Sequence, residues 1–79
     1  LFRSCSMKKE MIMALTNHFH GEIGKHKINV EVFLSNPVGV GEHIDIMETL
    51  SVELGKIAEF EDKLMILEQY FKQEEAPKI

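Results

Sequence analysis

The chain has 79 residues, of which 44% are hydrophobic and 28% charged, and its formal net charge is -4 at pH 7. These values are typical of one small folded domain and argue against nonspecific attraction to nucleic-acid phosphates or anionic membranes. The only cysteine, Cys5, excludes an intrachain disulfide, and no Cys/His spacing matches a structural zinc site. A domain this small has little room for a core of its own, so we expect it to need a partner.

The first residues of the chain carry no targeting signal. Lys8, Lys9 and Glu10 interrupt the apolar residues where a signal peptide would have its hydrophobic region. No apolar run approaches the roughly 20 residues that span a bilayer. We therefore expect a protein that is neither secreted nor membrane-bound. Met7 resembles a natural start, and residues 1–6 are interpreted as a disordered or non-native extension.

Apolar residues three, four or seven apart predict an amphipathic helix over about 7–35. This stripe consists of Ile12, Leu15, Phe19, Ile23, Val30 and Phe33, with one place left for His26 or Lys27. A competing α+β interpretation places a strand at 27–34, where β-branched residues alternate with others. A lone strand has no partner for its backbone groups, so the helix is preferred.

A turn is predicted over 36–41, where Pro37 disfavours helix in the preceding residue and two glycines follow. A second helix is predicted over about 42–72, followed by a flexible tail over 73–79. Its apolar stripe consists of Met47, Leu50, Leu54, Ile57, Phe60, Leu64, Leu67 and Phe71. Glu53 falls beside this stripe and is interpreted as its solvent edge. Residues 7–72 then form one helical hairpin domain.

The two predicted helices are nearly equal in length, which predicts an all-α fold, an antiparallel two-helix hairpin. Residues whose numbers sum to about 77, such as Val30 and Met47, are then expected at the same level along the hairpin. Gly21, Gly24 and Gly55 then share one level, where two backbones or a second hairpin can approach closely. One hairpin cannot cover its own apolar face, so we expect a homo-oligomer, a dimer forming a four-helix bundle. The predicted interface comprises Ile12, Leu15, Phe19, Ile23, Leu50, Leu54, Ile57, Phe60, Leu64, Leu67 and Phe71.

Few residues suggest chemistry. His18, Glu22 and His26 are four apart and would form a ladder on one helix, and His43 follows the turn, so these four are the candidates for a metal site. The alternative is a solvated polar edge, because His18 and His26 are two turns apart. Cys5 has no base placed near it by the sequence. We expect no catalytic residues, no cofactor and no enzymatic activity.

The segments KHKINVEVFL, NPVGVGEH and AEFEDKLMILEQYF carry a resemblance to a family of small uncharacterised proteins of T4-like marine cyanophages. The resemblance covers about 55 residues and implies a viral origin, with the host cytoplasm or the virion as location. It brings no site residues. The chain start before Met7 would suit a gene recovered from marine environmental DNA.

These observations favour a non-enzymatic helical module for protein–protein interaction or structure, of phage origin. Its expected partner is a second copy of the chain, and another phage or host protein is the alternative partner. The alternative function is a metal-binding helical bundle. Nucleic acid is not expected as a partner, because the only basic cluster beyond Lys8 and Lys9 is Lys25 to Lys27.

Overall fold

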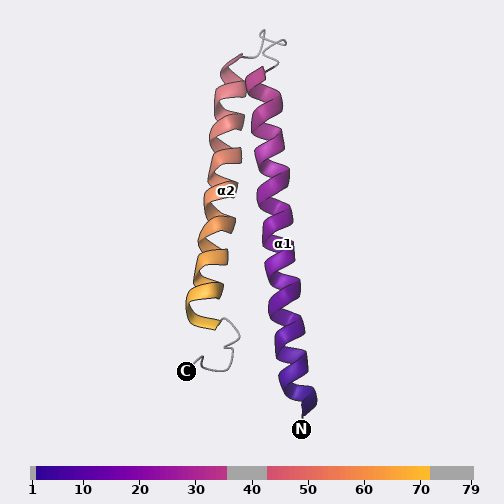
Figure 1. Ribbon diagram of the computed structural model, residues 1–79. Coiled ribbons are helices and arrows are strands. Elements are labelled where there is room, and N and C mark those ends of the chain that lie inside the picture. Colours follow the sequence, from indigo (N-terminus) through magenta and orange to yellow (C-terminus); the bar gives the residue numbers. More distant parts are fainter. Residues whose placement is uncertain (1, 36–42, 72–79) are drawn as a thin grey trace, which may run out of the picture.

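The computed structural model describes residues 2–35 and 43–71, which form two α-helices. Side chains are described from residue 7 in the first helix and from residue 45 in the second. Helix α1 covers Phe2–Ser35 and helix α2 covers His43–Phe71. The helices run antiparallel and side by side along most of their length (Figure 1). The predicted all-α helical hairpin is thus confirmed.

The helix boundaries agree with the prediction except at the first residue. Helix α1 ends at Ser35, and its backbone is helical across 27–34, so the alternative strand is wrong. Helix α1 begins at Phe2 instead of near residue 7, because Phe2 to Ser6 contain no glycine or proline that would stop helix propagation. The predicted turn over 36–41 and the tail over 73–79 lie outside the described residues.

Fourteen of the less exposed residues follow one another, within each helix, at alternating steps of four and three residues, the spacing of a coiled-coil seam. On α1 they are Ile12, Thr16, Phe19, Ile23, His26, Val30 and Phe33. On α2 they are Ile46, Leu50, Glu53, Ile57, Phe60, Leu64 and Leu67. We refer to these fourteen residues as the seam. The other partly covered residues lie directly beside them: Glu22, Gly24, Asn29 and Thr49. His26 fills the place that the predicted stripe of the first helix left open.

The register of the two helices differs from the predicted one by two residues. His26 bonds Glu53, and the rings of Phe19 and Phe60 lie 6.0 Å apart, so numbers of level residues sum to 79 rather than about 77. The predicted level pair Val30 and Met47 is therefore wrong, as is the interpretation of Glu53 as a solvent edge. The apolar stripe alone favoured a seam through Met47 and Leu54, but hydrogen bonds to the Glu53 carboxylate compensate for its partial burial.

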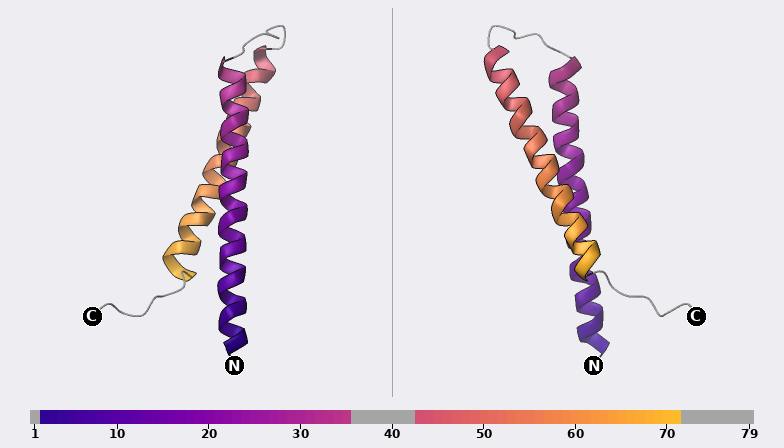
Figure 2. Two further views of the ribbon diagram at one scale, coloured as in Figure 1. Left: turned by 45° about the vertical axis from the view of Figure 1, so that its right-hand side comes forward. Right: turned by 90° about the vertical axis from the view of Figure 1, so that its left-hand side faces the viewer.

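The hairpin encloses very little. Ile23, 8% exposed, is the one buried hydrophobic residue among the described side chains, and none of these is fully buried. The molecule measures 60 × 24 × 16 Å, and the first turns of α1 project past the end of α2 (Figure 1). The helices also cross at an angle, so they diverge away from their crossing (Figure 2). Each helix consequently has one neighbour and one narrow contact strip.

The three described glycines do not bring the two helices together. A Cβ built at Gly21, Gly24 or Gly55 meets no atom within 4 Å. The predicted close approach of the two backbones of one hairpin at these glycines is therefore wrong. Within the hairpin these residues lower helix stability without a packing benefit in return.

Replacing Gly21 or Gly55 by alanine should raise the free energy of unfolding by about 0.5–1 kcal/mol each, because alanine loses less backbone entropy in a helix and has open space here. Thermal unfolding followed by circular dichroism measures the change. Ala58→Gly, at an exposed position of α2, is the matched control and should lower stability by a similar amount. A destabilised Gly55→Ala variant would contradict the open surroundings of that glycine.

Candidate functional site

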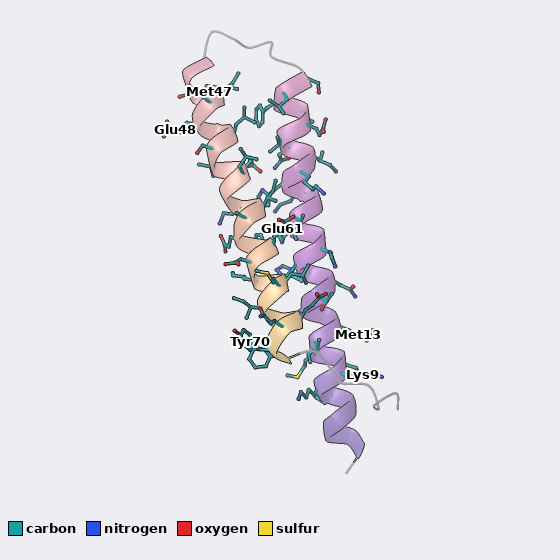
Figure 3. The ribbon with its side chains drawn as sticks, turned by 60° about the vertical axis from the view of Figure 1, so that its left-hand side comes forward. Lys9, Met13, Met47, Glu48, Glu61 and Tyr70 are labelled. Atoms are coloured by element: carbon teal, nitrogen blue, oxygen red, sulfur yellow. The ribbon has the colours of Figure 1, made fainter. Side chains whose placement is uncertain are left out.

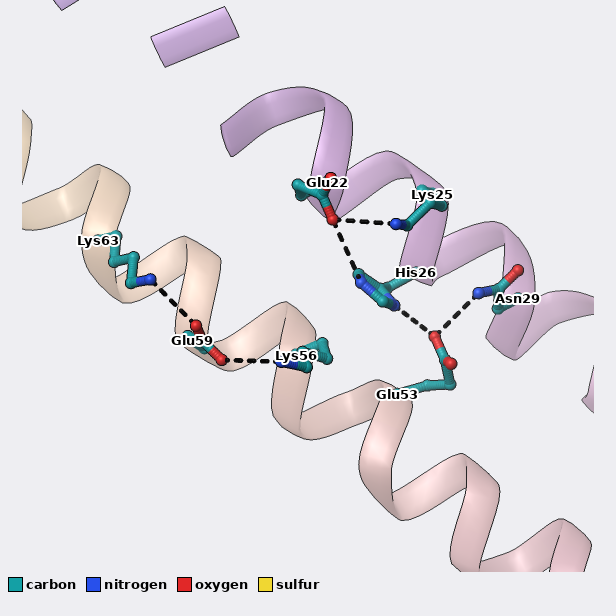
Figure 4. A network of polar contacts seen from close by, with 8 residues as sticks. All are labelled: Glu22, Lys25, His26, Asn29, Glu53, Lys56, Glu59 and Lys63. Atoms are coloured by element: carbon teal, nitrogen blue, oxygen red, sulfur yellow. Dashed lines mark hydrogen bonds and ion pairs between the residues drawn. The ribbon is translucent and has the colours of Figure 1, made fainter. Parts of the chain in front are cut away.

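A polar cluster interrupts the apolar seam where α1 and α2 pass each other. Nδ1 of His26 donates to Oε1 of Glu53 at 2.5 Å, and Nδ2 of Asn29 donates to the same oxygen at 3.0 Å (Figure 4). His26 and Asn29 lie three residues apart on α1 and therefore on one side of it, facing α2. The Glu53 carboxylate thus joins the two helices through two hydrogen bonds.

This cluster is largely shielded from water. His26 is 9% exposed, and the side chain of Glu53 is 16% exposed. The hydrogen bond from His26, followed by that from Asn29, holds the pKa of Glu53 below its ordinary value of 4.5, while desolvation opposes the shift. The carboxylate is accordingly stabilised in its charged form by contacts that exist only when the helices are paired.

The second ring nitrogen of His26 lies against another carboxylate. Its Nε2 is 3.5 Å from Oε1 of Glu22, one turn earlier on α1, and Nζ of Lys25 is 3.1 Å from the same oxygen (Figure 4). The hydrogen bond from Lys25 is the main reason why the pKa of Glu22 is lowered. The imidazole is therefore held between one carboxylate from each helix.

An aromatic ring also packs against the face of the His26 imidazole. The Phe60 ring of α2 stacks on His26 with a centroid distance of 6.2 Å and an interplanar angle of 13°, and it meets His18 edge-on at 6.2 Å. Phe19 lies 6.0 Å from Phe60, and Nζ of Lys63 lies 5.2 Å from the ring centre. Phe60 is thus the apolar support of the polar cluster.

The residues predicted as metal candidates are not gathered around one point. His18 and His26 are two turns apart, about 12 Å along α1, and Phe60 lies 6.2 Å from each of them. A metal ion would need both imidazole nitrogens at about 2 Å. Only Glu22 and His26 approach each other, and within the described residues no three His, Cys, Asp or Glu side chains form a metal-ion site. The His43 side chain lies outside the described residues.

The predicted interface residues divide into two groups. Most of them line the seam, where they are at least partly covered: Ile12, Phe19, Ile23, Leu50, Ile57, Phe60, Leu64 and Leu67. Leu15, Leu54 and Phe71 are 44%, 54% and 56% exposed, so the hairpin itself does not cover them. Whether copies of the chain meet at these residues stays a prediction.

Apolar side chains also remain exposed outside the predicted interface. Among the described large hydrophobic side chains, those most exposed include Met47 at 70% and Tyr70 at 68% (Figure 3). At the open end of the hairpin an apolar groove of about 590 Å³ lies between the helices. Its lining consists of Met7, Lys8, Met11, Ile12, Leu15, Leu67 and Phe71. Surface of this kind is typical of a protein that binds another protein.

Sequence reasoning missed Glu53 and Asn29 as functional residues. A signal for Glu53 was present, because steps of four and three from Ile46 to Leu67 include it as a seam position. Asn29 lies beside the seam of α1, and only the position of Glu53 across from it gives it a partner. Apart from the contact of His26 with Glu22, the contacts described above for His26, Asn29 and Glu53 join α1 to α2, which indicates a role in pairing the helices.

Removing one member of the His26–Glu53 pair should destabilise the hairpin, whereas removing both should not. His26→Leu leaves the Glu53 carboxylate with Asn29 as its one hydrogen-bond donor among the described side chains of α1, so unfolding should require less denaturant. The double variant His26→Leu/Glu53→Leu extends the apolar seam and should recover at least the original stability. Urea unfolding at one protein concentration compares the unmodified protein, the single variants His26→Leu and Glu53→Leu, and the double variant. A double variant whose loss equals the sum of both single losses would contradict the coupling.

Stability should fall in acid, because the pKa of Glu53 is lowered in the folded protein. The unfolded chain then binds the extra proton first, so the stabilisation is complete above pH 4.5 and is lost as the pH falls through the lowered pKa. Glu53→Gln should flatten this part of the stability–pH curve. Glu59→Gln is the control: the pKa of Glu59 is also lowered, chiefly by Lys63, but this ion pair is exposed and screened, so its effect should be smaller. Equal curves for Glu53→Gln and the unmodified protein would refute the role of this carboxylate.

Known proteins give no independent indication of what the cluster or the exposed surface does. Comparisons with protein-family models, curated proteins and solved structures find no match for the chain. Neither described helix combines the length and the apolarity needed to cross a bilayer. Function is therefore argued from the side chains of the hairpin.

Proposed function

We propose that the protein is a non-enzymatic helical interaction module that acts by self-association, with two hairpins packing into a four-helix bundle. The observation that carries this proposal is the balance of burial: Ile23 is the one buried hydrophobic residue among the described side chains, while fourteen large hydrophobic residues remain at least 43% exposed. Monomeric soluble proteins rarely leave so much apolar surface uncovered.

The geometry favours a second layer of helices as the cover. Two helices side by side have a flat face along each side of their seam, and a bundle buries such faces without changing either helix. The exposed residues lie on both helices and along their whole described length, from Met7 to Leu34 and from Met47 to Phe71. A short peptide or a small ligand would cover only part of this surface.

The resemblance to cyanophage proteins supports a phage origin as part of this proposal. A protein of this kind would assemble with itself in the infected cell or in the virion, and another phage or host protein could bind the completed bundle. The formal net charge of -4 supports a protein rather than a nucleic acid as partner.

Light scattering after size-exclusion chromatography tests self-association. At micromolar concentration we expect a mass of twice the 9.1 kDa of one chain. The midpoint of thermal unfolding should also rise with protein concentration, because association stabilises the folded state by mass action. A one-chain mass together with an unfolding midpoint that does not change with concentration would refute the proposal.

A further inference from the structure

We draw no further inference here: the strongest candidate, the apolar groove at the open end of the hairpin between Met7, Met11 and Leu15 of α1 and Leu67 and Phe71 of α2, carries nothing, because no contact among the described residues shows what covers it.

Discussion

Two helices can shield only the strip of side chains that each turns toward the other, and this limit governs the whole molecule. The strip here is a seam with alternating steps of four and three residues, and it leaves Ile23 as the one buried hydrophobic residue that the structure describes. The other apolar residues of the seam are only partly covered, and fourteen large hydrophobic residues outside it are at least 43% exposed. The exposed apolar residues are therefore a consequence of the architecture, and they make association the natural way to complete the core.

The seam is also interrupted by polar residues at one level. His26 and Glu53 occupy positions that would hold apolar residues in a uniform coiled coil, and Asn29 adds a second hydrogen bond to the same carboxylate oxygen. A polar contact of this kind adds little stability compared with apolar packing, but it is satisfied in only one register. The structure thus gives the cluster a role in aligning the two helices, with Phe60 holding the imidazole in place.

The sequence predicted the hairpin well because helical periodicity and the Pro37 region are local signals. It predicted the register less well. The apolar stripe on the second helix is wide, so the seam can run either through Met47 and Leu54 or through Ile46 and Glu53. Which of the two forms depends on the residues of the first helix that face the seam. Only the paired structure places His26 opposite Glu53 and so favours the polar option. The metal-site hypothesis also came from one helix considered alone, in which His18, Glu22 and His26 form a ladder. The structure adds the second helix, whose Phe60 ring lies beside both His18 and His26.

Small-angle X-ray scattering tests the central claim, that two hairpins complete one core side by side, most directly. The account predicts a forward intensity corresponding to two chains together with a maximum dimension close to the 60 Å length of one hairpin, because side-by-side pairing thickens the particle without lengthening it. A forward intensity corresponding to one chain would contradict it. A two-chain particle nearly twice as long would contradict it as well, since the exposed apolar side chains beside the seam would then remain uncovered along most of each hairpin.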